Sequence, residues 1–312
     1  MINTQQKTYV SDDFIMQPTV DFCFKELMSN PKVRQGLISA LLNVAPESIV
    51  STTLLPTFLE KEYPDDKIGI LDVRVLLSDG TQIDFEMQVA PFDFWTHRIL
   101  FYLSGMYVSQ IKQGEGYEQL RKCIHVSLLD FVHFSGDDVC FRKISFCNEH
   151  TGQKYSDLLE IFILELPKLP PEDRSESGIL RWMRFFHGKT RKEMESMAQK
   201  DPYIDEAYSM LQKMSADDRK RMEYEARQKA IRDHNIMIYS AQRQGMERGK
   251  LQGETLGLLR SIVSLFQKDF SPAQVSDLLD LDPAYVQQVF SLASASSDPM
   301  RELSKFYDIL NE

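Results

Sequence analysis

The chain has 312 residues, of which 43% are hydrophobic and 26% are charged, and it carries a formal net charge of −10. This acidic balance argues against a protein that coats nucleic acid non-specifically, although an enzyme could still grip DNA locally through a metal and a few cations. No apolar run approaches the ~20 residues that span a bilayer, so no membrane segment is expected. The N-terminus lacks the order of a signal peptide and the four cysteines show no CxxC spacing, which predicts a cytoplasmic protein with reduced thiols.

The first 17 residues are typical of a flexible tail, and the globular part is expected to begin at Pro18. The segment that follows, PTVDFCFKELM, places Asp21 and Lys25 four residues apart on one helix face. A surface ion pair is the ordinary interpretation of this spacing. A role near a functional site is the alternative.

A second helix is predicted from Pro31 to about Val44, with Asn30 as its N-cap and proline at its first turn. A short strand at 49–55 and a polar loop up to Asp66 are expected to follow. These elements lead into the most informative stretch of the chain.

The segment from Lys67 to Val89 is typical of two β-strands joined by a tight turn. Apolar residues alternate with polar ones along both strands, at Leu71, Val73, Val75, Leu77, Ile83, Phe85, Met87 and Val89. The opposite face carries polar side chains, among them acids where a half-buried strand usually has none: Asp72, Arg74, Gln82, Asp84, Glu86 and Gln88.

The length of the turn decides whether Asp72 and Glu86 meet. A two-residue loop would place them on opposite faces of the hairpin. A three-residue loop over 78–80 pairs Leu77 with Thr81 and sets Asp72 directly across from Glu86. We expect the three-residue loop, because Gly80 suits the left-handed position at its end.

Directly opposed residues have Cβ atoms roughly 5 Å apart. Two carboxylates held that close repel each other unless a proton or a cation lies between them. Mg²⁺ and similar hard cations prefer oxygen ligands of this kind. Asp72 and Glu86 are therefore predicted to lie on one face and to form a cation site.

After the hairpin, Asp93 is expected to be the N-cap of a helix that runs to about Gln113. Arg98 and Tyr102 lie four residues apart on one face of this helix. Further strands are predicted at 124–131, 141–146 and 158–166, the first so apolar that it should be buried on both faces. The order of elements predicts a mixed α/β core.

The region 171–216 is expected to be a helical extension packed on this core. Its segment RWMRFFHGKTRK is basic, and its aromatic residues are better explained as the buried side of a helix than as a DNA-contacting patch. No histidine of the chain lies in a HExxH pattern, so all six are interpreted as structural.

One long helix is predicted over 217–270, with glycines every fourth residue at Gly245, Gly249, Gly253 and Gly257. This stripe predicts a weak, bendable connecting helix, with close approach of a partner helix and a homo-oligomer as the alternative. Residues 271–312 are expected to form a small helical module, with helices opened by proline after Ser271 and Asp282. The second of these helices, from Pro283, has no Lys or Arg, which favours an interaction module over DNA reading.

The order of elements matches the core of the restriction-endonuclease-like fold, and the local sequence extends the likeness. The segments PTVDFCFKELM, ILDVRVLLSDGTQIDFEMQ, HRILFYLSGMYVSQIKQGEGYEQL, IHVSLLDF and LELPKL resemble the bacterial Rpn family of recombination-promoting nucleases, which are PD-(D/E)XK transposases. The similarity spans residues 15 to 240. It implies an α/β, restriction-endonuclease-like mixed-sheet core at 18–170 with a helical C-terminal region.

The resemblance implies that Asp72 and Glu86 hold Mg²⁺ together with the backbone carbonyl of Met87. Gln88 takes the catalytic position where many relatives have lysine. A glutamine can hydrogen-bond the attacking water, but it carries no charge and cannot act as a base. This departure affects the expected rate rather than the expected site.

The resemblance also places Arg98 and Tyr102 in the substrate-binding region. For Arg98, contact with a phosphate and a structural salt bridge to Asp72 or Glu86 are equally open, whereas Tyr102 is expected to pack. Asp21 and Lys25 are the candidate accessory residues.

The sequence thus predicts a Mg²⁺-dependent endonuclease that binds DNA and acts in recombination or on mobile-element DNA. The alternative is a DNA-binding or protein-interaction scaffold that keeps the nuclease fold with weak or no catalysis.

Overall fold

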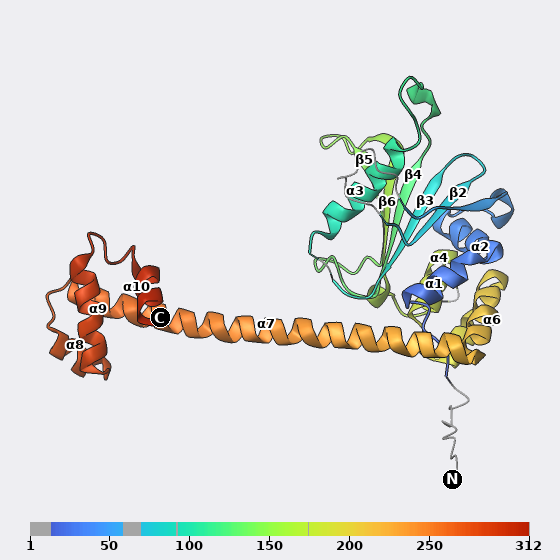
Figure 1. Cartoon of the computed structure of the whole chain (residues 1–312). Helices are drawn as coiled ribbons and strands as arrows, with labels where there is room; N and C mark the ends of the chain where they lie inside the picture. Colours follow the sequence, from blue (N-terminus) through green and yellow to red (C-terminus); the bar gives the residue numbers. More distant parts are fainter. Residues whose placement is uncertain (1–13, 59–69, 92, 174, 312) are drawn as a thin grey trace, which may run out of the picture. The chain divides into compact units, whose positions relative to one another are not determined.

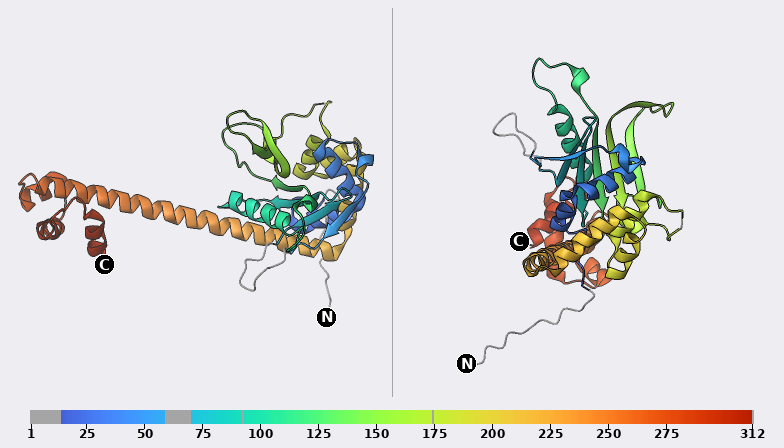
Figure 2. Two further views of the ribbon diagram at one scale, coloured as in Figure 1. Left: turned by 90° about the horizontal axis from the view of Figure 1, so that it is seen from above. Right: turned by 90° about the vertical axis from the view of Figure 1, so that its right-hand side faces the viewer.

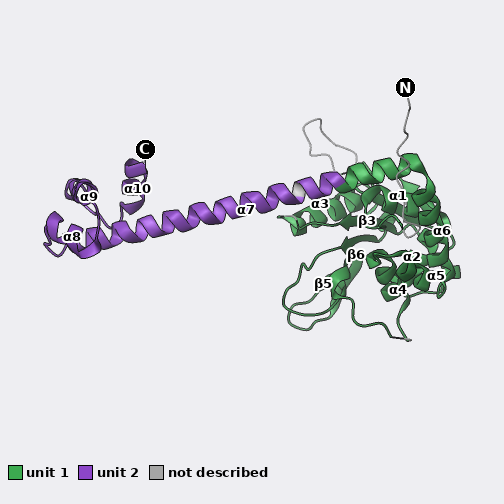
Figure 3. Cartoon of the chain, turned by 90° about the horizontal axis from the view of Figure 1, so that it is seen from below, with its two compact units in different colours: residues 1–228 green, residues 229–312 purple. Residues whose placement is uncertain are grey.

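The structure is a computed structural model that describes residues 14–58, 70–91, 93–173 and 175–311 (Figure 1). Residue contacts divide the chain into two compact units, residues 1–228 and residues 229–312 (Figure 3). The division falls inside the predicted long helix, rather than at the predicted boundaries 216/217 and 270/271. Most of the predicted N-terminal tail and most of the loop that leads to Asp66 lie outside the described residues.

Six strands of the described part of unit 1 form one mixed sheet in the order β1-β2-β3-β4-β6-β5. The strands are Thr52–Leu55 (β1), Val73–Leu77 (β2), Gln82–Gln88 (β3), Cys123–Leu129 (β4), Phe141–Cys147 (β5) and Lys154–Glu165 (β6). Strands β3, β4 and β6 run parallel, while β1–β2, β2–β3 and β5–β6 are antiparallel pairs. The predicted α/β class with a mixed sheet is confirmed.

Helices cover both faces of this sheet (Figure 2). The larger core joins strand residues such as Phe85 and Phe162 to five helices on one face. These helices are Asp21–Ser29 (α1), Pro31–Leu42 (α2), Gly178–His187 (α4), Arg191–Ala198 (α5) and Pro202–Ala216 (α6). Trp95–Val108 (α3) packs on the opposite face, over two smaller clusters that contain Cys123 and Ile163.

The hairpin has the predicted register. Val73 pairs with Phe85, and the N–H of Leu77 donates to the carbonyl of Thr81 at 2.8 Å across a three-residue loop. Gly80 supplies the left-handed residue of this loop, with φ +88°. Continued by one residue, the same register sets Asp72 across from Glu86.

The predicted alternation fails at the start of this hairpin. The chain bends at Asp72, and Leu71 packs in the cluster below α3 with Tyr102, whereas Val73 belongs to the core on the other face. Leu71 and Val73 therefore do not share a face. The bend frees Asp72 from strict strand geometry.

Several predicted boundaries differ from the structure. Helix α3 begins at Trp95 and ends at Val108, and its N-cap is Phe94 rather than Asp93, because Phe94 adopts a left-handed conformation with φ 66°. Ile15 and Met16 are buried in the core, so packed chain begins before Pro18. The start of α2 is as predicted, since the Asn30 side chain accepts from the second and third helical N–H groups.

Aromatic residues of α4 fill the interior of the helical layer. Trp182, Phe185 and Phe186 are fully buried, which supports packing over a DNA-contacting role. Short 3₁₀ turns complete unit 1 at Pro46–Ser48, Tyr117–Gln119 and Leu166–Lys168.

Helix α7, Asp218–Phe266, begins in unit 1 and ends in unit 2. In unit 2 its last turns pack with three short helices around Leu259, Ile262 and Val263. These are Pro272–Leu279 (α8), Pro283–Ala295 (α9) and Leu303–Asn311 (α10), and Ser271 and Asp282 cap the first two as predicted. Among the described residues, no helix has the length and apolarity to cross a membrane.

Candidate active site

Two acidic side chains of β3 are buried beneath α3. Asp84 is 0% exposed and Glu86 is 1% exposed. They share a face because they are two residues apart on a strand, and this face is covered because α3 packs over it. Burying a carboxylate is costly unless it finds a partner, so their contacts identify the chemistry of the site.

Glu86 has one satisfied oxygen and one unsatisfied oxygen. Its Oε1 lies 3.2 Å from Nη2 of Arg98, which comes from α3. Its Oε2 is buried and has no hydrogen-bond partner in the described part of the chain. The guanidinium of Arg98 is in turn 5.3 Å from the ring centroids of both Trp95 and Tyr102.

The environment raises the pKa of Glu86 to about 7. Burial is the largest cause, and the nearby charge of Asp84 acts in the same direction, while His125 and Arg98 oppose it. Glu86 therefore changes its charge close to neutral pH. A perturbed carboxyl of this kind is a frequent mark of a functional site.

Asp72 lies at the bend before β2 and has a different cation. Its Oδ1 is 3.0 Å from Nζ of Lys25 on α1. Its Oδ2 accepts a hydrogen bond of 3.4 Å from the backbone N–H of Met87, the residue after Glu86. This bond joins Asp72 to the strand that carries Glu86.

Asp21 is linked to Asp72 through Lys25, which pairs with both acids. Lys25 lies 3.6 Å from Asp21 as well as 3.0 Å from Asp72, and Arg227 lies 3.4 Å from Asp21. The predicted pairing of Asp21 with Lys25 is thus present. The bridge from Lys25 to Asp72 joins residues that are 47 positions apart in the sequence, so local spacing does not predict it.

A buried polar chain lies beside Glu86. His125 Nδ1 is 2.8 Å from Asp84 Oδ2, and His125 Nε2 is 3.0 Å from the hydroxyl of Ser127. All three residues are 0% exposed. Burial raises the pKa of Asp84, although its hydrogen bond to His125 acts against this, and its Oδ1 has no partner within the described residues.

Sequence analysis did not single out this Asp84–His125–Ser127 chain. The available signal was the presence of His125 and Ser127 in an otherwise apolar strand that pairs with β3. Without the register that sets Asp84 opposite His125, the three could not be connected.

Gln88 closes the strand at the edge of the sheet and is partly exposed. Its carbonyl accepts a hydrogen bond of 2.9 Å from the N–H of Asp130, which follows β4. The segments that leave β3 and β4 are thereby tied together next to the acids. The side chain of Met87 points away into the core, so only its backbone faces the site.

The donor set fits a hard divalent cation. The described residues contain no group of three or more His, Cys, Asp or Glu side chains arranged to hold a metal. A cation here would instead be held by the two carboxylates of Asp72 and Glu86 and by the carbonyl of Met87. The buried and partnerless Oε2 of Glu86 supports this assignment, because such an oxygen calls for a cation or a proton.

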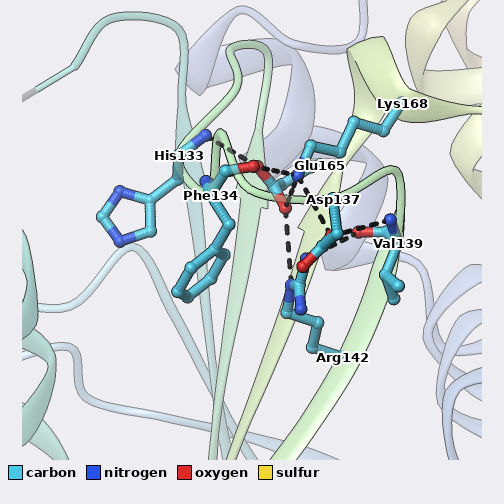
Figure 4. Close-up of polar contacts among 7 residues, drawn as sticks. All are labelled: His133, Phe134, Asp137, Val139, Arg142, Glu165 and Lys168. Atoms are coloured by element: carbon cyan, nitrogen blue, oxygen red, sulfur yellow. Dashed lines mark hydrogen bonds and ion pairs between the residues drawn. The ribbon is translucent and has the colours of Figure 1, made fainter.

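A second buried glutamate at the same edge is fully satisfied. Glu165, at the end of β6, is 0% exposed and accepts from the N–H groups of His133 at 2.6 Å and Phe134 at 3.0 Å. Lys168 lies 3.0 Å and Arg142 3.6 Å from its other oxygen (Figure 4). Burial alone would raise the pKa of Glu165, but these donors hold it below its usual value.

Comparison with known families decides which protein class carries this site. A family model described as PD-(D/E)XK nuclease family transposase matches residues 18–241. The chain belongs to this family. The match includes every candidate site residue and ends within α7. No curated protein and no solved structure matched the chain.

Membership in the PD-(D/E)XK nuclease family transposases relates the acids of the hairpin to a nuclease-type function. The mixed sheet with an acid before β2 and another in β3 is consistent with a nuclease-type function. Nucleases of the PD-(D/E)XK type generally use divalent cations, in agreement with the oxygen donors found here.

Proposed function

We propose that the protein is a metal-dependent DNA endonuclease, with a divalent cation held by Asp72, Glu86 and the carbonyl of Met87. The observation that carries this proposal is the buried Oε2 of Glu86, which has no partner in the described chain, while Asp72 accepts from the N–H of Met87, the next residue along β3. The family points to action in recombination or on mobile-element DNA. We place this activity in the cytoplasm.

When bound, the cation would lower the pKa of a water and neutralise charge on the phosphate under attack. The side chains of the protein would orient the water and balance the charge of the phosphate. Gln88, at the end of β3, would orient the water through its amide but would not take its proton. The proton would therefore leave to solvent or to a phosphate oxygen.

Lys25 is proposed to supply the positive charge that Gln88 lacks. Its ammonium reaches Asp72 from α1, at 3.0 Å. In this position it can compensate for negative charge that develops on the phosphate, as a lysine at position 88 would. Asp21 would keep the ammonium extended toward the site.

Arg98 is proposed to exchange partners during binding. In the structure it neutralises Glu86. A cation at Glu86 would take over that task and free the guanidinium to contact a phosphate. Tyr102 is buried against Arg98, so it is better placed to orient the guanidinium than to touch DNA.

The proposal is tested with purified full-length protein, supercoiled plasmid and Mg²⁺. The wild type is expected to nick the plasmid, and Asp72→Asn and Glu86→Gln are expected not to. Nicking that persists in both variants would show that another site, or a contaminating nuclease, cuts the DNA.

A scaffold that binds without cutting is the second candidate. The neutral Gln88 favours it, because this position carries no charge to support catalysis. DNA binding by the wild type with no nicking under any divalent cation would establish it.

Self-association through α7 is a separate proposal. The glycine stripe of this helix is open, since a methyl group added at Gly245, Gly249, Gly253 or Gly257 would meet no described atom within 4 Å. Light scattering of the wild type and of Gly249→Lys measures it. If both proteins are monomeric, self-association through α7 is refuted and α7 is only a connecting helix.

A further inference from the structure

A hollow of about 440 Å³ lies at the edge of the sheet beside the candidate active site. Its walls come from the loop that leads from β3 into α3, from the first turn of α3 and from the loop that follows β4. The lining is mostly aromatic and includes Asp93, Phe94, Trp95, His97, Phe131 and His133. This volume lies within the range of ~300–1,000 Å³ typical of small-molecule sites.

The topology of the sheet places the hollow next to Asp84 and Glu86. Strands β3 and β4 are parallel, so both end at this edge, and the Asp130 N–H is tied to the Gln88 carbonyl at 2.9 Å. Trp95 lines the hollow and also packs against Arg98, which contacts Glu86. A group bound in the hollow would therefore be close to a phosphate held at Glu86.

Phe94 is the unusual residue of this lining. It is 73% exposed, and its φ of 66° is a conformation that bulky residues rarely adopt. Its ring meets the ring of His97 edge-on, with 5.8 Å between centroids. Packing does not explain why an exposed aromatic side chain is kept in a strained conformation, and such strain is often found at binding sites.

The part of the lining that comes from the loop after β4 is fixed in place by Glu165. This buried carboxylate accepts from the backbone N–H groups of His133 and Phe134, while the imidazole of His133 points away from it (Figure 4). The loop after β4 thus presents the His133 ring from a rigid anchor. The exposed side chains of Phe94 and His133 both line the hollow, and aromatic rings in such a lining are suited to stacking against a flat ligand.

We propose that this hollow binds one unpaired nucleobase of the DNA strand being cut, stacked on Phe94. The proposal rests on the proposed nuclease function and deepens it by naming the substrate class. That class is DNA with an unpaired nucleotide beside the scissile phosphate, such as a bulge, a mismatch or a single-stranded segment.

The chemistry of the lining favours a base over other occupants. Every base has an apolar face that stacks on aromatic side chains, and a polar edge that Asp93, His97 or His133 can hydrogen-bond. A paired base cannot enter a hollow, because it would have to leave the helical stack first. An unpaired base avoids most of that cost.

The test measures binding of short labelled duplexes to full-length protein in EDTA, so that no cutting occurs. Three duplexes are compared, with no bulge, with a one-nucleotide bulge, and with the same bulge lacking its base. The wild type is expected to prefer the base-containing bulge over both others by about 10-fold, which corresponds to one base–aromatic stack. The abasic bulge separates recognition of a base from recognition of bent DNA.

Three variants sharpen the result. Phe94→Gly relieves the backbone conformation while it removes the ring, so its thermal midpoint should not fall, and its preference for the bulge should be lost. Phe94→Tyr keeps a stacking surface and should keep the preference. Tyr155→Ala removes an aromatic residue that is 87% exposed at the opposite end of the sheet and should change nothing.

Equal binding of the three duplexes by the wild type, or an unchanged preference in Phe94→Gly, would overturn the proposal. So would a complete lack of DNA binding. Because binding is measured without metal and without cutting, it is independent of the plasmid assay. Nicking without a base preference would support the nuclease proposal and refute base binding in the hollow. A base preference without nicking would support base binding and refute the nuclease proposal.

Discussion

Glu86 and Glu165 are two buried glutamates near the same edge of one sheet, and they differ in the number of donors they receive and in the direction of their pKa shifts. Glu165 receives two backbone N–H groups, a lysine and an arginine, and its pKa is lowered. Glu86 has one arginine and a bare buried oxygen, and its pKa is raised to about 7. The first arrangement satisfies a buried charge and ties down a loop, whereas the second leaves a buried oxygen without a partner among the described residues.

This difference shows that burial alone does not distinguish a structural acid from a functional one. Both side chains are almost completely inaccessible, at 0% and 1% exposure. What separates them is the number of donors each receives. A fold that leaves a charge unsatisfied loses stability there, and this loss is expected at sites that bind something.

The largest expected difference concerns cutting. Glu86→Gln should lower the rate of plasmid nicking by at least about 1,000-fold, because a neutral amide holds a divalent cation poorly and the metal contributes several kcal/mol to the barrier. Glu165→Gln, assayed at a temperature where it is folded, should retain a rate within about 5-fold of wild type. A matching loss in both variants would remove the distinction between the two acids.

The next difference concerns stability. Glu165→Gln should lower the free energy of unfolding by about 3 kcal/mol, because it leaves Lys168 and Arg142 without their buried counter-charge. Glu86→Gln should change it little or raise it, since it removes a poorly satisfied charge. Urea denaturation monitored by circular dichroism measures both variants. An equal loss of unfolding free energy in Glu165→Gln and Glu86→Gln would contradict the difference proposed between the two acids.

The two acids should also give opposite dependences on pH. The folded pKa of Glu86 lies above its unfolded value of 4.5, so the contribution of Glu86 to stability is present at low pH and is lost as pH rises from 4.5 to about 7. The loss should be on the order of 3 kcal/mol, since one pKa unit corresponds to about 1.4 kcal/mol. The difference in unfolding free energy between wild type and Glu86→Gln should follow this window.

Glu165 should behave with the reverse sign. Its folded pKa is lowered, so its contribution is present above pH 4.5 and is lost as pH falls below it. Both profiles are obtained without metal. A flat difference between wild type and Glu86→Gln from pH 4.5 to 7 would show that Glu86 is not held as described.

The smallest effect is expected at Lys25. Lys25→Met should lower the nicking rate by about 10-fold, and Lys25→Arg should restore most of it, if a cation beside Asp72 replaces a lysine at position 88. Lys32→Met offers a control, because Lys32 pairs with Glu206 outside the candidate site. A rate in Lys25→Met equal to that of Lys32→Met would leave Lys25 a structural partner of Asp21.

Much of the fold could be predicted because it follows from local patterns. Period-two alternation and the glycine at position 80 predicted the hairpin register, in which Val73 pairs with Phe85. Proline and capping residues predicted the starts of α2, α8 and α9. Each of these depends on residues that are neighbours in the sequence.

The contacts that define the site could not be predicted in the same way. The Asp84–His125 pair depends on how β3 and β4 align, and the Lys25–Asp72 pair depends on where α1 packs. The bend that moves Leu71 to the other face interrupts a pattern that appears regular in the sequence. Glu165 carried one usable signal, an acid inside the apolar run IFILEL, which should have marked a buried and satisfied charge.

The measurement that tests the central claim most directly counts bound cations. Mn²⁺, a spectroscopic substitute for Mg²⁺, is titrated into full-length protein at about pH 8, where Glu86 is deprotonated, and free Mn²⁺ is read by electron paramagnetic resonance. The wild type and the control Glu47→Gln, which changes an exposed acid in the 3₁₀ turn Pro46–Ser48, should each bind Mn²⁺ at the site. The Asp72→Asn, Glu86→Gln double variant should lose this binding. Equal binding by all three proteins would contradict the assignment of Asp72 and Glu86 as the metal ligands.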